Sequence, residues 1–218
     1  MTTLQSQSVI VGGALAVAIA AAALSSDAAT RALTIDPGRS RATITVGKGG
    51  ALSFAAGHTH EVVAPTISGV INVDAVDLAA SRVRLTIDAA ALHVTGKGEP
   101  AKDVPEVERV MLSDKVLDVG RYPTITFEST GLTVDKRDGT VVDASIAGQL
   151  TLHGVTRSMN LPVHIELTTT HDALTARGQL RVKQTDYGMT PVTVAGVVKV
   201  KDMLDVDFLI VADARSGG

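Results

Sequence analysis

The chain has 218 residues, of which 45% are hydrophobic and 20% are charged. These proportions exclude a disordered chain and provide enough apolar side chains for one folded domain and a leader. The formal net charge of −3 comes without a basic stripe, so nucleic acid is not expected as a partner. The absence of cysteine excludes disulfides, thiolate metal sites and cysteine nucleophiles.

An apolar run of Val, Ile, Ala, Gly and Leu occupies residues 9–24. It is shorter than the roughly 20 residues that a membrane-spanning helix needs, and it matches the core of a signal peptide. Ser26 and Ala28 form the small-x-small pattern of a cleavage site. We therefore expect a signal peptide over residues 1–28, a folded domain over residues 29–218 without an integral membrane segment, and a periplasmic or secreted protein. A retained Ala-rich anchor is the alternative, because no Lys or Arg precedes the run.

Most of the chain after Arg31 alternates between apolar and polar residues with a period of two. This alternation predicts strands that have one buried face and one solvated face. Short turn signals such as Asp36-Pro37-Gly38 and His153-Gly154 separate the runs, which implies antiparallel neighbours. The predicted strands cover residues 42–46, 67–73, 82–87, 124–128, 146–152, 159–167, 174–183, 192–200 and 204–212.

Residues 103–111 break the strand pattern. Asp103 and Glu106 have the spacing of a capping box, in which the first residue caps a helix and the second reaches back to it. Val107, Val110 and Met111 then form an apolar stripe at helical spacing. The segment predicts one short amphipathic helix across an end or a side of the β domain.

Many two-faced strands without a covering helical layer must pack as two sheets or close into a barrel. Only 2% of the residues are aromatic, so few large side chains are available to fill the interior. Two interpretations are open: an internal space that an apolar ligand occupies, or small side chains that draw the walls together. The first interpretation favours a carrier over a catalyst.

Three stretches of the sequence resemble the YceI-like family of exported lipid-binding proteins. They are DVGRYPTITFEST at residues 118–130, GQLTLHGVTR at residues 148–157 and TDYGM at residues 185–189. Their order and spacing are similar to those of the family, and the resemblance covers about residues 31–213. The segment from Arg39 to Glu61 departs from the usual pattern, which indicates a divergent member.

The resemblance implies an all-β, lipocalin-like antiparallel barrel of about eight strands with one short α-helix, a size that holds one small ligand. It also implies an internal pocket for a polyisoprenoid or a similar long-chain amphiphile. No catalytic residue and no cofactor come with the resemblance. A homodimer is left open.

The predicted ligand contacts are apolar residues on the buried faces of the strands, together with two histidines at the rim of the barrel. They are Ile71, Leu85, Ile125, Phe127, Leu150, Leu161, Leu180, Phe208, His58 and His60.

His58 and His60 lie two residues apart, so a strand would place both imidazoles on one face. We interpret them as a polar rim that contacts a ligand head group. The alternative is a zinc or copper site, or a metal-dependent enzyme, with His93 as a third ligand, since Glu61 would face the opposite way. A further alternative is a ligand-free barrel that docks a membrane partner. The sequence contains no nucleophile elbow, phosphate loop or dinucleotide fingerprint.

The leader is expected to be removed on export. The intact mass of the exported protein should then correspond to a chain that begins near Ala29, because the short apolar run and the small-residue site together direct cleavage. A membrane-bound form that still begins at Met1 or Thr2 would show instead that the run is a retained anchor.

Overall fold

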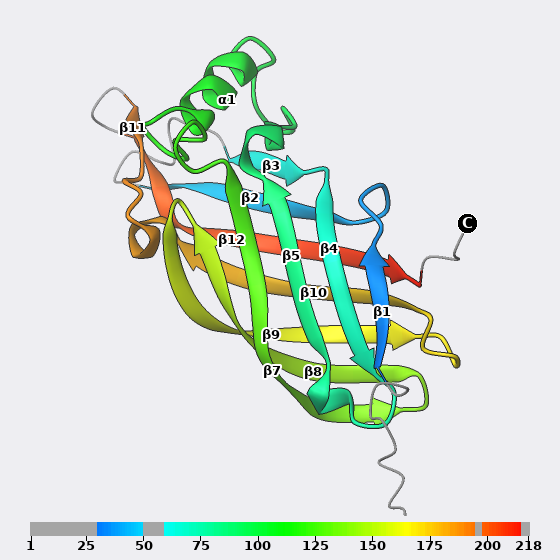
Figure 1. Cartoon of the computed structure of the whole chain (residues 1–218). Helices are drawn as coiled ribbons and strands as arrows, with labels where there is room; N and C mark the ends of the chain where they lie inside the picture. The colour runs from blue at the N-terminus through cyan, green and yellow to red at the C-terminus, as the bar shows by residue number, and fades with distance from the viewer. Residues whose placement is uncertain (1–29, 50–58, 195–197, 215–218) are drawn as a thin grey trace, which may run out of the picture.

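The structure, a computed structural model, describes residues 30–49, 59–194 and 198–214 (Figure 1). The strands are β1 (Thr30–Ile35), β2 (Arg41–Gly49), β3 (His60–Ala64), β4 (Ile67–Asp74), β5 (Arg82–Asp88), β6 (His93–Val94), β7 (Thr124–Asp138), β8 (Val141–Leu152), β9 (Val155–Leu167), β10 (Ala173–Lys183), β11 (Thr193–Val194) and β12 (Val198–Asp213). The helical elements are α1 (Val104–Leu112) and the 3-10 turns η2 (Leu78–Ala80), η3 (Ala89–Ala91) and η4 (Gln184–Tyr187). The predicted signal peptide, residues 1–28, and His58 lie outside the described residues.

Eight strands form a closed antiparallel barrel. The ring follows the order β1-β4-β5-β7-β8-β9-β10-β12 and closes where β1 pairs with β12. Strands β2, β3 and β6 extend the same sheet from β12, and α1 lies beyond this extension at one end of the barrel (Figure 1). The prediction of an all-β, eight-stranded barrel with one short helix is confirmed.

The last strand is longer than the sequence indicated. Two separate strands were expected over residues 192–200 and 204–212, whereas β12 runs without interruption from Val198 to Asp213. Its pairing with β2 shifts register between Val200 and Leu204, and such an irregularity lets one strand bend instead of ending. The short strand β11 pairs with the beginning of β12.

The predicted helix is present as α1, but the predicted capping box is wrong. Asp103 has helical dihedral angles (φ −89°, ψ −23°) and makes no side-chain capping bond, whereas a capping residue needs an extended backbone. Glu106 pairs with Arg109 on the next turn instead of reaching back. Within the described residues, no helix has the length and apolar character needed to cross a membrane.

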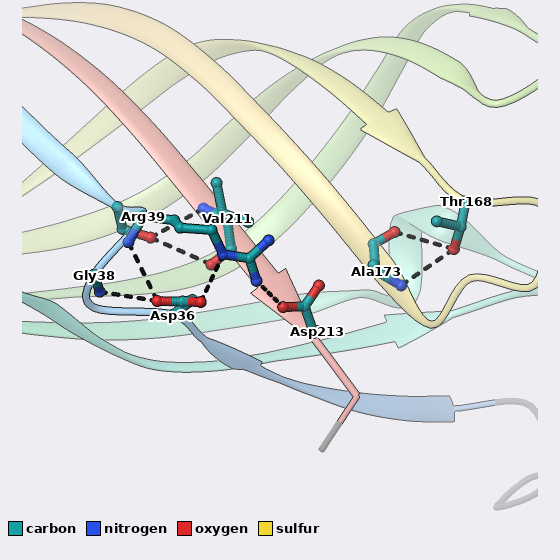
Figure 2. A network of polar contacts seen from close by, with 8 residues as sticks. Asp36, Gly38, Arg39, Thr168, Ala173, Val211 and Asp213 are labelled. Atoms are coloured by element: carbon teal, nitrogen blue, oxygen red, sulfur yellow. Dashed lines mark hydrogen bonds and ion pairs between the residues drawn. The ribbon is translucent and has the colours of Figure 1, made fainter. Parts of the chain in front are cut away.

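A polar network ties the β1–β2 turn to the end of β12 (Figure 2). Asp36 accepts a hydrogen bond from the backbone amide of Gly38 and forms an ion pair with Arg39. Arg39 also forms an ion pair with Asp213. The hydrogen bond from Arg39 is the main reason that the pKa of the Asp36 carboxyl lies below its ordinary value. Ser40, which is 2% exposed, bonds the backbone of Val211 with its hydroxyl as both donor and acceptor. The turn thus attaches both β1 and β2 to one edge of β12.

Two phenylalanine rings in the barrel wall lie over glycines of neighbouring strands. A Cβ atom on Gly148 would lie 2.3 Å from Phe127 Cζ, and a Cβ atom on Gly178 would lie 2.5 Å from Phe208 Cζ. Each glycine therefore provides the space in which an aromatic ring rests against the backbone. This explains two of the glycines inside strands as sites of close packing.

Replacing Gly148 with alanine is expected to destabilise the barrel. The added methyl group would overlap the Phe127 ring and the Glu128 carbonyl, so we expect a loss of about 1–3 kcal/mol in the free energy of unfolding. Denaturant unfolding measures this change. Gly131→Ala in the same β7–β8 hairpin is the matched control, because a Cβ atom there meets nothing within 4 Å, and it should change stability by less than about 0.5 kcal/mol. Equal losses in both variants would contradict the packing argument.

Candidate functional site

The interior of the barrel holds a cavity of about 620 Å³. Apolar side chains from β2, β3 and every ring strand except β1 line it, and Val107, Val110 and Met111 of α1 cover one end. Pockets for drug-sized ligands typically range from about 300 to 1,000 Å³, so the space is large enough for one such molecule. Of the two interpretations of the low aromatic content, the structure supports the roomy interior.

The structure places nine of the ten predicted contact residues on the cavity wall. These are Ile71, Leu85, Ile125, Phe127, Leu150, Leu161, Leu180, Phe208 and His60. The period-two pattern of the strands put their side chains on the correct face because successive residues of a strand point to opposite sides of the sheet. Contact of these residues with a ligand remains a prediction.

His60 begins β3 and lines the cavity near the end that α1 covers. Its Nδ1 atom lies 2.9 Å from Oε2 of Glu99, whose side chain is completely buried. The backbone amide of Val94 in β6 donates to Glu108 of α1, which holds the helix against this end of the barrel. Asp103, at the start of the helix, also lines the cavity. The sequence pattern did not single out Glu99, and its contact with His60 bridges 39 residues of chain.

Four of the other five polar side chains on the cavity wall bond the protein's own backbone, and the fifth, Glu106, pairs with Arg109. Ser129 accepts from the amide of Val83, Ser81 accepts from the amide of Asp74, and Gln184 donates to the carbonyl of Lys201. Arg82 donates to two carbonyls of the η2 turn. These groups satisfy buried or half-buried backbone atoms and leave the wall between them apolar.

Among the described residues, His60 does not belong to a metal-binding cluster. His60 already bonds Glu99 through Nδ1, Glu61 pairs with Lys97, and His93 is exposed and absent from the cavity wall. The described ranges hold no group of three or more His, Cys, Asp or Glu side chains placed to bind a metal ion. His58 lies outside them.

One part of each motif that carries the family resemblance belongs to a cluster outside the cavity, whereas Phe127, Leu150 and Met189 of the same motifs line the cavity wall. The rings of Tyr122 and His153 contact each other with their centroids 4.5 Å apart and their planes tilted by 58°, and a Cβ atom on Gly154 would lie 2.4 Å from the Tyr122 ring. His153 Nδ1 lies 3.1 Å from the carbonyl of Tyr187, in the third motif. Arg157 donates to the carbonyl of Asp186. His153 therefore stabilises a turn, and the cluster fastens the β7, β8–β9 and η4 connections to one another.

The fold and its apolar cavity define a lipocalin-like β-barrel. The YceI-like domain matches residues 33–212, and the chain belongs to this family. No curated protein matches the chain.

Solved structures share this fold at low sequence identity. BcnA of Burkholderia cenocepacia is 17% identical with a TM-score of 0.62, over 81% of this chain and 98% of that protein. A polyisoprenoid binding domain from Saccharophagus degradans is 16% identical with a TM-score of 0.59, over 84% of this chain and 98% of that domain. A YceI protein of Campylobacter jejuni is 16% identical with a TM-score of 0.51, over 69% of this chain and 82% of that protein. At these identities the likeness is one of fold.

The purified protein is expected to contain no stoichiometric metal. The Nδ1 atom of His60 is bonded to Glu99, which leaves the side chain only one ring nitrogen for a ligand. Elemental analysis should therefore find far less than one zinc or copper per chain, and a chelator should leave the melting temperature unchanged. A zinc content near one per chain that disappears in His60→Ala would reverse this expectation and establish the metal site.

Proposed function

We propose that this protein is an exported carrier that holds one long apolar molecule, a polyisoprenoid or a similar amphiphile, inside its barrel. The observation that carries the proposal is the cavity of about 620 Å³ with an almost wholly apolar wall. An apolar cavity of this size is favourable for a hydrocarbon chain and unfavourable for a polar metabolite.

Burial of the chain supplies the binding free energy. Each methylene transferred from water contributes about 0.8 kcal/mol in gross terms. Ordering the flexible tail and losing translational freedom offset much of this gain. The affinity should consequently rise with chain length until the cavity is filled.

Two further observations support the ligand class and the location. The Saccharophagus degradans domain with the same fold is named for polyisoprenoid binding. The apolar run over residues 9–24 has the length and composition of a signal peptide, in agreement with the exported YceI-like family. We assign no reaction to the cavity, because most of its polar side chains in the described part of the chain bond the backbone.

Native mass spectrometry of the protein purified from its own host tests the proposal directly. A bound species with a constant added mass, identified as a long-chain apolar molecule after extraction, is the expected result. A protein that carries no such species, and that also takes up no polyprenyl probe after delipidation, would contradict the carrier function.

Leu150→Trp is expected to block the cavity without unfolding the barrel. Leu150 lies on β8 and faces the cavity, so the larger indole side chain of tryptophan should extend into empty space instead of a packed core. Overfilling a packed core costs about 1–3 kcal/mol, whereas here the melting temperature should stay nearly unchanged while lipid uptake is lost. Gln149→Trp is the matched control, since Gln149 is exposed on the outer face of the same strand and should retain uptake. Lost stability with full lipid content in Leu150→Trp would mean that the space is not a binding site.

A further inference from the structure

The polar atoms on the cavity wall differ between its two ends. Arg82 and Ser81 lie at the start of β5, and β5 runs from there toward the end that α1 covers (Figure 1). At the Arg82 end, the guanidinium group and the serine hydroxyl are bonded to the backbone. At the α1 end, His60 and Asp103 line the cavity and retain hydrogen-bonding capacity.

The unused capacity is clearest at the His60–Glu99 pair. The Glu99 side chain is 0% exposed, and its Oε2 atom bonds His60 Nδ1 at 2.9 Å. Its Oε1 atom is buried without a hydrogen-bond partner in the part of the chain that the structure describes. Buried polar groups are normally satisfied, and one that is not commonly marks a site with a function beyond folding.

The pair fixes the chemistry of the ring nitrogen that remains. A carboxylate only accepts hydrogen bonds, so the Nδ1 atom of His60 carries the proton that it shares with Glu99. In the neutral imidazole the Nε2 atom is then an acceptor, and no described residue bonds it. His60 thus offers an acceptor whose ring orientation is held by a buried carboxylate.

The surrounding charges favour the same type of ligand group. Asp103 lines this end and makes no side-chain bond to the helix that it precedes, so its carboxylate is a second acceptor. Glu106 also lines this end and is paired with Arg109. Among the described wall residues, the one Lys or Arg is Arg82, at the opposite end. An anionic head group at the α1 end would therefore face the like charges of two carboxylates, which is unfavourable.

We propose that the α1 end of the cavity is a head-group site for an uncharged hydrogen-bond donor, namely a hydroxyl on a long apolar chain. The Nε2 atom of His60 accepts a hydrogen bond from the hydroxyl, Glu99 positions the imidazole, and Asp103 provides the second acceptor. The same carboxylates exclude phosphate and carboxylate heads. This inference rests on the proposed carrier function and specifies which amphiphile the carrier selects.

Three probes with one shared hydrocarbon chain test the inference on the delipidated exported protein. They are geranylgeraniol, its methyl ether and its monophosphate, and their affinities are measured by calorimetry and by competition in native mass spectrometry. The alcohol is expected to bind about tenfold more tightly than the ether, which corresponds to one net hydrogen bond. The monophosphate is expected to bind most weakly of the three.

Glu99→Gln is the decisive variant because it keeps the size of the side chain and removes its charge. We expect the preference for the alcohol over the ether to fall below about threefold, since the tautomer of His60 is no longer fixed, and the monophosphate to gain affinity. Glu61→Gln is the matched control: Glu61 is the next residue of β3, pairs with Lys97 and is absent from the cavity wall, so the preference should persist. Affinity for the ether reports whether each variant retains its barrel. If Glu99→Gln does not fold, His60→Leu is measured in its place and should abolish the preference.

The outcomes separate this inference from the carrier function. Failure of the wild-type protein to bind any of the three probes would contradict the proposed function itself. Binding of all three with equal affinity, or tightest binding of the monophosphate, would overturn the head-group site and leave the carrier function intact. A preference for the alcohol that persists unchanged in Glu99→Gln would also overturn it.

Discussion

The edge of β12 that pairs with β1 and β2 is where the sheet of this protein closes on itself. β2 covers that edge from Lys199 to Leu209, β1 takes the last pairs at Ala212 and Asp213, and β10 occupies the opposite edge. Closure leaves a ring of eight strands, whose diameter is set by strand number and stagger. A ring of this size is wide enough to be filled by large side chains or to hold one ligand. The sizes of the inward side chains therefore decide between a solid core and a cavity.

The barrel wall is closely packed at two places without filling the interior. Phe127 and Phe208 are two of the three phenylalanines, and each rests against a glycine of a neighbouring strand instead of extending across the barrel. The other inward positions carry mainly Val, Ile, Leu and Ala, whose side chains are shorter than aromatic ones and extend less far into the interior. Tight packing within the wall and empty space at the centre thus come from the same placement of side chains.

The motif residues that fasten turns and the residues that would select a head group lie in different places. Tyr122, His153 and Tyr187 belong to the motifs and fasten turns outside the cavity. His60, Glu99 and Asp103 lie outside all three motifs, at or behind the cavity wall. This separation is consistent with structural likeness at sequence identities of 16–17%.

The sequence by itself determined the local features of this protein. Period-two alternation assigned Ile71, Leu150 and Leu180 to the inner face, because the pleat of a strand alternates side chains without regard to its partners. Helical spacing located α1 for the same local reason, although the capping box failed because the backbone of Asp103 continues the helical conformation. Only the tertiary structure decided that the small side chains surround a cavity and do not draw the walls together, since the circumference of a closed sheet depends on pairing between distant strands. It alone brought Glu99 to His60 across 39 residues, because that contact depends on how β6 and the loop before α1 pack against the barrel end.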